Sequence, residues 1–367
     1  MPDLKNHAVF AALRRMRTFL NPGTSTTGNV GSDRQEQLFQ GAAGAARSSG
    51  LSTSREEPPD RHPAPHRSAS PRPASLASEN TSYPDNNIQP ENIIWMFGTA
   101  RTGSTWLSAM MGELAEGNWW REPLVGQLFD SFYDSTIAPH FERPHFILSN
   151  ATRDSWLEGI RGFVLNAIQA HFSGEDNYLV VAEPNGSIGA PLIMEALPES
   201  KMVFLVRDPR DVAASALDRN RKGSDAYKTR AQDPRKAKTL ANNPADHNPD
   251  GFIKTQAQRY VRNVSRARQA FENHRGPKVM IKYEDLRSET LQTMKRLYAE
   301  LGISVDEEEL ARVVGKHSWE NIPKEKKGPG KSNRKATPGG WREDLTPEQV
   351  EIVERVTVPL LKEFYPN

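Results

Sequence analysis

Residues 98–107, with the sequence GTARTGSTWL, combine small residues, hydroxyl groups and one cation directly after the apolar run 92–97. A buried strand that enters a small-residue turn and then a helix directs several backbone N–H groups at one point. The helix dipole adds about half a positive charge there. Arg101 supplies a full charge on this loop, and Ser104 and Thr105 supply hydroxyl groups. The pattern predicts a binding site for phosphate or sulfate.

This loop departs from the common nucleotide-binding loops. A Walker A loop has the pattern G-x-x-x-x-G-K-[ST], in which the lysine contacts phosphates and the hydroxyl contacts Mg²⁺. Gly98 and Gly103 have that spacing, but Ser104 occupies the lysine position and the cation is Arg101 instead. The G-x-G-x-x-G pattern of dinucleotide-binding proteins is also missing. Taken alone, the loop has one alternative interpretation, an ordinary strand-to-helix turn with a capping hydroxyl.

A second candidate anion site follows the apolar, β-branched run 201–206. Asp208 is suited to the N-cap of a helix and Pro209 to its first position, so these two residues are explained by helix initiation alone. Helix initiation does not explain Arg207 or Ser215. These two side chains could bind a second phosphate through charge-assisted hydrogen bonds.

A third element, residues 334–342 with the sequence RKATPGGWR, is basic and rich in turn residues. It leads to a helix that should begin near Thr346, a good N-cap, with Pro347 at the first position. Arg334 and Lys335 could contribute charge to an anion site. The alternative is a solvated surface loop.

Together the three elements resemble those of the PAPS-dependent sulfotransferases, in the same order along the chain. PAPS is 3′-phosphoadenosine 5′-phosphosulfate. Residues 101–107 resemble the 5′-phosphosulfate loop of that family, and Arg207 followed eight residues later by Ser215 resembles its 3′-phosphate motif. The third element matches the family's last signature at Arg334, Lys335, Gly339, Trp341 and conservatively Arg342, whereas Ala336 and Gly340 depart from it.

The resemblance implies a P-loop-like sulfotransferase fold over residues 91–367: an α/β domain with a single doubly wound parallel sheet flanked by helices. It implies that PAPS is the co-substrate and 3′,5′-ADP the product. The residues implied to bind the nucleotide are Arg101, Thr102, Gly103, Ser104, Thr105, Trp106, Arg207, Ser215, Arg334, Lys335 and Gly339. Trp106 would stack on the adenine, or else it is a core tryptophan of the first helix.

Sulfuryl transfer to a hydroxyl group also needs a general base. In some branches of the family this base is a glutamate about twenty residues past the phosphosulfate loop, and Glu122 lies at that distance past Arg101. We expect Glu122 in the loop after the first helix, where Trp119 and Trp120 could desolvate its carboxyl group and raise the pKa. The alternative is an ordinary surface glutamate. His140 and His145 are the fallback bases.

One position departs from the family pattern. Relatives often carry a lysine that contacts the sulfuryl group near the end of the strand predicted at 178–182, and this chain has Ala182 there. Arg101 could act alone as the catalytic cation, or another cation such as Arg121 could reach the site. The following residue, Glu183, is either structural or binds the acceptor.

The elements that position these residues alternate between strands and helices. Strands are expected at 92–97, 178–182, 201–206 and 279–283, and helices at 105–116 and 252–274 and from about Ser288 and Asp306. This alternation favours a parallel sheet, whose ligands bind beyond the carboxyl ends of the strands. Because Arg101 and Arg207 both follow strand ends, we expect them to meet in one crevice. The long segment 219–251 is either a lid or a surface loop.

Composition limits the alternatives. The 367-residue chain has a formal net charge of +2 and no cysteine, which excludes disulfides and thiolate metal sites. No His, Asp and Glu cluster has metal-ligand spacing, so we expect no metal, and no nucleic-acid motif is present. No apolar run approaches the ~18 residues of a membrane span, which argues against a Golgi-anchored enzyme. The expected location is therefore cytoplasmic.

Residues 1–90 differ from the rest of the chain. From 21 to 87 they are rich in Ser, Pro, Gly and Arg, and such a segment cannot bury enough apolar surface to offset its ordering entropy. We expect a disordered low-complexity tail, with a possible short helix in the first twenty residues that is a transit peptide, a partner-binding helix or a frayed end.

The function favoured by the sequence is transfer of a sulfuryl group from PAPS to a hydroxyl group of a small-molecule or glycan acceptor, by in-line displacement with general-base assistance. The alternatives are a P-loop-like nucleoside or small-molecule kinase and an inactive nucleotide-binding relative. The acceptor and the oligomeric state are not specified by the sequence.

Overall fold

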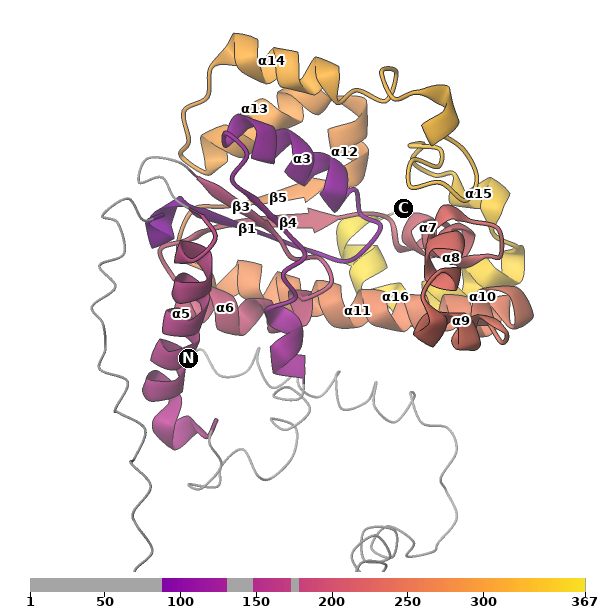
Figure 1. Ribbon diagram of the computed structural model, residues 1–367, viewed down its shortest axis with the longest axis horizontal. Helices are drawn as coiled ribbons and strands as arrows, with labels where there is room; N and C mark the ends of the chain where they lie inside the picture. The colour runs from indigo at the N-terminus through magenta and orange to yellow at the C-terminus, as the bar shows by residue number, and fades with distance from the viewer. Residues whose placement is uncertain (1–87, 131–147, 173–177, 367) are drawn as a thin grey trace, which may run out of the picture. The chain divides into compact units, whose positions relative to one another are not determined.

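A five-stranded parallel sheet forms the centre of the computed structural model, which describes residues 88–130, 148–172 and 178–366 (Figure 1). The strand order is β2-β3-β1-β4-β5. The strands are β1 (Ile93–Phe97), β2 (Trp119–Arg121), β3 (Leu179–Ala182), β4 (Lys201–Val206) and β5 (Lys278–Lys282). In the middle strand, Trp95 pairs in parallel with Val181 on one side and with Met202 on the other. The expected single parallel sheet is confirmed.

The sheet is buried on both faces, because helices cover each of them (Figure 1). All five residues of β1 are buried, as is typical of strands in doubly wound sheets. Their side chains alternate between two cores: Trp95 and Phe97 belong to one, and Ile94 and Met96 to the other. The first core also contains residues of α5, α6, α11 and α16, and the second contains residues of α3, α12, α13 and α14.

The helices of the described residues vary from one turn to seven. They are α3 (Ser104–Leu114), α5 (Arg153–Gln169), α6 (Ala190–Ala196), α7 (Pro209–Asn220), α8 (Asp225–Ala231), α9 (Pro234–Leu240), α10 (Pro244–His247), α11 (Pro249–Asn273), α12 (Tyr283–Ser288), α13 (Thr290–Glu300), α14 (Glu307–Lys316), α15 (Trp341–Asp344) and α16 (Pro347–Phe364). Short 3₁₀ turns occupy Pro90–Asn92, Gly126–Phe129, Asn150–Thr152, Ser187–Gly189 and Lys324–Lys326.

The capping residues identified in the sequence do begin helices. The Asp208 side chain accepts the backbone N–H of Arg210 at the start of α7. Thr346 forms a capping box with Gln349 at the start of α16. Because Pro209 lacks an N–H and has a helix-compatible φ, it fits the first position of α7 without loss of a hydrogen bond.

Two parts of the predicted organisation are wrong. Trp119–Arg121, expected in a loop, is the edge strand β2, which pairs in parallel with β3. The segment 219–251 is not one long loop, because it holds the short helices α8, α9 and α10 and the start of α11. The predicted tail and N-terminal helix, up to residue 87, and the fallback bases His140 and His145 lie outside the described residues.

The chain leaves the carboxyl end of β1 toward one face of the sheet, through α3. After its two neighbours, β3 and β4, the chain packs on the opposite face through α6 and α11 (Figure 1). A doubly wound sheet binds ligands where the direction reverses in this way, outside the carboxyl ends of the strands. The carboxyl end of β1 is therefore the place where a ligand site is expected.

Candidate functional site

The loop between β1 and α3 is held in an uncommon backbone conformation. Arg101 has φ 74° and Gly103 has φ 89°, both in the left-handed region. A Cβ at Gly103 would lie 2.6 Å from Cδ2 of Tyr283, so only glycine fits at this position. The buried Thr102 hydroxyl donates to the carbonyl of Thr99 at 2.8 Å. Thr102 and Gly103 therefore shape the loop, and the first N–H groups of α3 open beside it.

Arg101, Arg207 and Ser215 lie together at the carboxyl ends of β1 and β4. Nε of Arg101 donates to Oγ of Ser215 at 3.0 Å, and Nη1 of Arg207 donates to the backbone carbonyl of Arg101 at 3.1 Å. The expected meeting of the two arginines is thus seen. The side chain of Arg101, whose backbone is left-handed, makes a hydrogen bond with Ser215 on α7.

Arg207 is nearly buried, with 7% of its surface exposed. Its guanidinium lies 4.1 Å above the ring of Tyr283, and Nη2 is 3.8 Å from the carboxylate of Asp211. Nε of Arg207 is buried and has no hydrogen-bond partner among the described residues. Buried donors are nearly always paired in native proteins, so this N–H indicates a missing acceptor. An anion at this position would supply one.

Positive charge is concentrated around Arg101. The pKa of Arg101 is lowered to about 10, first by burial and then by the neighbouring charges of Arg219, Arg207 and Arg334. Nη1 of Arg219 also donates to the hydroxyl of Ser332 at 3.3 Å. Four guanidinium groups from four segments therefore converge, and a bound anion would relieve their mutual repulsion.

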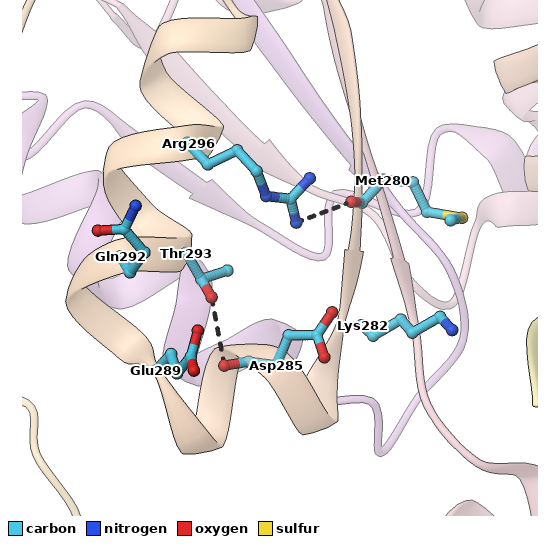
Figure 2. A pocket seen from close by; sticks show the side chains of 7 residues that line it. All are labelled: Met280, Lys282, Asp285, Glu289, Gln292, Thr293 and Arg296. Carbon is cyan, nitrogen blue, oxygen red and sulfur yellow. Dashed lines mark hydrogen bonds between the residues drawn. The ribbon is translucent and has the colours of Figure 1, made fainter.

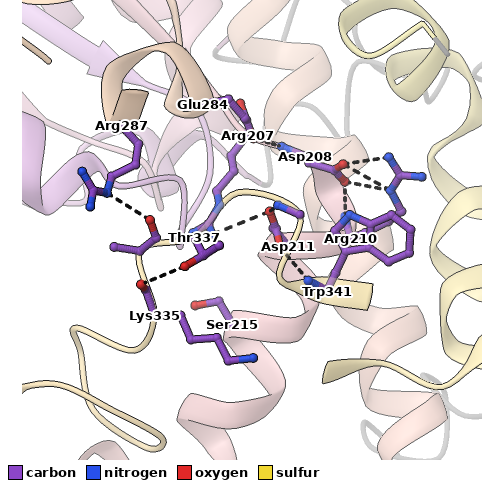
Figure 3. A network of polar contacts seen from close by, with 12 residues as sticks. Arg207, Asp208, Arg210, Asp211, Ser215, Glu284, Arg287, Lys335, Thr337 and Trp341 are labelled. Carbon is purple, nitrogen blue, oxygen red and sulfur yellow. Dashed lines mark hydrogen bonds and ion pairs between the residues drawn. The ribbon is translucent and has the colours of Figure 1, made fainter. Parts of the chain in front are cut away.

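Asp211 attaches the C-terminal loop to α7 (Figure 3). Its fully buried carboxylate accepts the backbone N–H of Gly339 at 2.8 Å and that of Trp341 at 2.9 Å. Burial raises the pKa of Asp211, and the charge of Arg207 acts in the opposite direction. Sequence reasoning missed this role for Asp211. The available signal was an acidic side chain in the first turn of α7, where a carboxylate is favoured by the helix dipole.

Arg334 and Lys335 are engaged in ion pairs with carboxylates of α15. Nη1 of Arg334 lies 2.5 Å from Oδ2 of Asp344, and Nζ of Lys335 lies 2.8 Å from Oδ1 of the same residue. Lys335 also contacts Glu343 at 2.9 Å. The charge of Arg334 acts on Arg101, but α15 supplies both Arg334 and Lys335 with a counter-charge. The sequence analysis did not foresee this partial neutralisation.

The first turn of α3 carries the remaining predicted contacts. Ser104 is buried at the first position of the helix, and the Thr105 hydroxyl is exposed and accepts from Nη2 of Arg121 at 3.4 Å. Trp106 is partly buried, and its indole N–H donates to the carbonyl of His317 at 2.8 Å. Its ring meets that of Tyr283 edge to face, with centroids 6.5 Å apart. Stacking of Trp106 on adenine stays a prediction.

Glu122 directly follows β2 and is exposed. Its Oε2 accepts from Nδ2 of Asn185 at 3.0 Å, and Oδ1 of Asn185 in turn accepts from Nη2 of Arg259 at 2.9 Å. The expectation that Trp119 and Trp120 desolvate Glu122 is wrong. Because Trp119 and Trp120 alternate along a strand, they turn toward the two opposite cores and leave Glu122 open to solvent.

The buried carboxyl group of this region is Glu183, at the end of β3. It is fully buried, and its Oε2 accepts the backbone N–H of Leu124 at 2.9 Å. A Cβ at Gly186 would lie 1.8 Å from Oε1, so the carboxyl group is packed directly against backbone. Burial raises the pKa of Glu183 to about 7, and the nearby charge of Glu122 acts in the same direction. This environment favours the structural role among the two considered for Glu183.

A cavity of about 390 Å³ lies apart from these residues, between the edge strand β5 and helices α12 and α13 (Figure 2). Asp285 and Glu289 line it, and Arg296 donates to the carbonyl of Met280 at 3.5 Å across it. Its two carboxylates are balanced by Lys282 and Arg296, so it has no excess of positive charge to attract phosphate groups. It is therefore not a second candidate for the anion site.

The described residues include neither a membrane-spanning helix nor a group of metal ligands. No helix in residues 88–130, 148–172 and 178–366 is both long enough and apolar enough to cross a bilayer. In the same described ranges, no three His, Asp or Glu side chains are grouped to hold a metal ion.

Comparison with known proteins identifies relatives of this chain. The family model described as "Sulfotransferase domain" matches residues 91–365. Carbohydrate sulfotransferase 2 of Homo sapiens and that of Mus musculus are each 26% identical over 183 residues, which cover 45% of this chain. The match spans about a third of these relatives, 34% of their length.

Solved sulfotransferase structures are also similar. Mouse sulfotransferase SULT7A1 complexed with PAP matches with a TM-score of 0.45 and 14% identity, over 77% of this chain and 88% of that one. Sulfotransferase STF9 from Mycobacterium avium matches with a TM-score of 0.46 and 13% identity, over 76% and 78%.

The curated relatives correct one expectation from the sequence. A cytoplasmic location is contradicted, because both matched proteins are carbohydrate sulfotransferases, which are not cytoplasmic enzymes. The expectation was based on the lack of a long apolar run and of cysteine, and such absences do not specify a compartment.

Proposed function

Since the chain belongs to the sulfotransferase family, we propose that it transfers a sulfuryl group from PAPS to a hydroxyl group of an acceptor. The observation that carries this proposal is the convergence of Arg101, Arg207 and Ser215 beside the first turn of α3. PAPS has phosphate groups at both ends of its ribose, and two adjoining anion sites match that arrangement.

We assign the 3′-phosphate to the arginine cluster. The buried, unpartnered Nε of Arg207 and the hydroxyl of Ser215 would donate to its oxygens, and Arg101 would add charge from the opposite side. The 5′-phosphosulfate is assigned to the start of α3, where the first backbone N–H groups and the hydroxyls of Ser104 and Thr105 are available. Arg334, Lys335 and Gly339 would close the nucleotide site from the C-terminal loop.

The chemistry requires one proton transfer and one displacement. We assign the general base to Glu122, whose exposed carboxylate is held by Asn185 and can take the proton of the acceptor hydroxyl. As the proton leaves, the acceptor oxygen bonds to sulfur, the bond between sulfur and the 5′-phosphate oxygen breaks, and its electron pair stays on that oxygen. The N–H groups of α3 stabilise this growing negative charge more in the transition state than in the ground state.

We propose that the acceptor is a carbohydrate hydroxyl group. The support is that both curated relatives are named as carbohydrate sulfotransferases. The exposure of Glu122 agrees with an acceptor that approaches from solvent, as a saccharide chain would. A small-molecule hydroxyl is the other outcome of the test below.

The test is a transfer assay with sulfate-labelled PAPS and a panel of oligosaccharides, alcohols and phenols. We expect labelled saccharide and equimolar 3′,5′-ADP, with ATP and Mg²⁺ giving no phosphorylated product. Labelled phenols or alcohols without labelled saccharides would contradict the carbohydrate acceptor. Phosphate transfer from ATP would favour the kinase alternative, and nucleotide binding without any transfer would favour the inactive relative.

A further inference from the structure

Arg121 is a cation beside the first turn of α3 that the nucleotide assignment does not use. It ends β2, and the alternation along this strand places it on the same sheet face as Trp119, whose side chain packs into the core that contains α3. Its Nη2 reaches the hydroxyl of Thr105 at 3.4 Å. Arg121 therefore lies against the first turn of α3 and next in sequence to Glu122.

The neighbouring strand leaves room for this side chain. Arg121 is the register partner of Ala182 on β3, and the two strands are parallel, so both side chains project from the same face at the same height. Ala182 is small and carries no charge. The guanidinium can thus extend past Ala182 toward the end of β1 without a neighbouring cation or bulky group on β3.

The charge of Arg121 is not neutralised by the fold. Among the described residues, Arg121 makes no ion pair, whereas Arg207 is near Asp211 and Arg334 contacts Asp344. Its hydrogen bond to Thr105 is long and exposed, and its guanidinium lies 6.0 Å from the centroid of the Trp119 ring, so these contacts contribute little to folding stability. A guanidinium that is held beside a helix N-terminus without a carboxylate partner among the described residues is suited to an anionic ligand group.

The cation of the preceding loop, Arg101, makes its side-chain hydrogen bond in another part of the site. The side chain of Arg101 donates to Ser215 and is thus on the 3′-phosphate side. Two of the described cations lie near Glu122: Arg259, which donates to Asn185 on the side of α11, and Arg121, which contacts Thr105 at the start of α3. A sulfuryl group on its way from the 5′-phosphate to an acceptor held by Glu122 must pass between the start of α3 and Glu122.

We propose that Arg121 is a catalytic residue that contacts the oxygens of the transferred sulfuryl group and stabilises it during displacement. This inference rests on the proposed function. Arg121 donates to the sulfuryl oxygens while Glu122 takes the acceptor proton, the acceptor oxygen bonds to sulfur, and the electron pair of the broken bond remains on the 5′-phosphate. The guanidinium neither gains nor loses a proton.

The test compares Arg121→Gln and Arg121→Lys with the matched surface variant Arg355→Gln, in the full chain. Arg355 is exposed on α16 and pairs with Glu351, away from the crevice. We expect Arg121→Gln to lower kcat for sulfuryl transfer about a hundredfold, the usual effect of removing one transition-state donor. The Kd of 3′,5′-ADP, which has no sulfuryl group, should stay within twofold of the unsubstituted chain.

Arg121→Lys should retain more turnover than Arg121→Gln, because it keeps the charge, and Arg355→Gln should change nothing. Equal loss of kcat and of 3′,5′-ADP affinity in Arg121→Gln would overturn the inference, since it would show a general nucleotide contact. Unchanged turnover in Arg121→Gln would overturn it as well. If the unsubstituted chain binds no 3′,5′-ADP and transfers no sulfate, the proposed function itself fails.

Discussion

The guanidinium of Arg207 donates a 3.1 Å hydrogen bond to the backbone carbonyl of Arg101, across 106 positions of sequence. This bond joins the end of β4 to the loop after β1 and holds that loop where the Arg101 side chain reaches Ser215. The two arginines therefore form one structural unit. In the account proposed above, this unit holds the 3′-phosphate of the nucleotide.

Replacement of Arg207 should selectively weaken binding of the 3′-phosphate. We expect Arg207→Ala to raise the Kd of 3′,5′-ADP more than tenfold in titration calorimetry, since a charge-assisted donor pair is lost. AMP has no 3′-phosphate, so its affinity should change much less. Equal weakening of both ligands would show that the variant damages the fold of the loop, and unchanged affinity would remove Arg207 from the site.

Replacement of Glu122 should separate binding from chemistry. We expect Glu122→Gln to bind 3′,5′-ADP with unchanged affinity while its turnover falls at least a hundredfold, because the amide cannot accept the acceptor proton. The matched control is Glu158→Gln, an exposed position on α5, which should keep full turnover. Turnover that survives in Glu122→Gln would show that another group is the base.

The importance of a glycine at position 103 can be tested by comparison with Gly117, which has nearly the same φ. We expect Gly103→Ala to destabilise the protein by about 1–3 kcal/mol, measured by denaturant unfolding, and to weaken nucleotide binding, because its Cβ would collide with the Tyr283 ring at 2.6 Å. Gly117 has φ +92° but open space around it, so Gly117→Ala carries the conformational strain alone. Similar losses in both variants would show that the collision with Tyr283 is unimportant.

The buried Glu183 predicts a pH dependence of stability. Its pKa is raised to about 7 in the folded chain, so between about pH 4.5 and 7 the folded state holds a proton that the unfolded state has released. Stability should therefore fall as the pH rises through this window, by up to about 3 kcal/mol for this group. The glutamine of Glu183→Gln cannot ionise, so the unfolding free energy of this variant should not show this fall with rising pH.

The measurement is the difference in unfolding free energy between the unsubstituted chain and Glu183→Gln at pH 5 and pH 7.5. The difference cancels the contributions of other buried carboxyl groups such as Asp211 and Glu284. A difference that does not change with pH would show that Glu183 titrates normally in the folded protein.

Sequence alone predicted four of the five strands and missed the edge strand β2. The runs that became β1, β3 and β4 are stretches of apolar and β-branched residues, as buried parallel strands require, and the other edge strand, β5, has an apolar centre of three residues between two lysines. The missed strand β2 has only three residues, and its third, Arg121, is exposed. Its pairing with β3 is a tertiary contact that no local pattern specifies.

In the site, too, features that follow from local sequence could be predicted, and tertiary contacts could not. The proximity of Arg101 and Arg207 was predictable, because both follow strands whose carboxyl ends share one edge of a parallel sheet. The role of Asp211 was not predictable, since it accepts from backbone N–H groups 128 and 130 positions away. Nor could local sequence show that Glu183, rather than Glu122, is the buried carboxyl group whose pKa is raised.

The central claim is that this crevice holds an adenosine phosphorylated at both its 3′ and 5′ positions. Titration calorimetry of the full chain with 3′,5′-ADP and with AMP tests it most directly. We expect 3′,5′-ADP to bind at least tenfold more tightly, without added metal, because only this ligand can occupy the cluster of Arg101, Arg207 and Ser215. Equal affinity for the two ligands, or no binding of 3′,5′-ADP, would contradict the account.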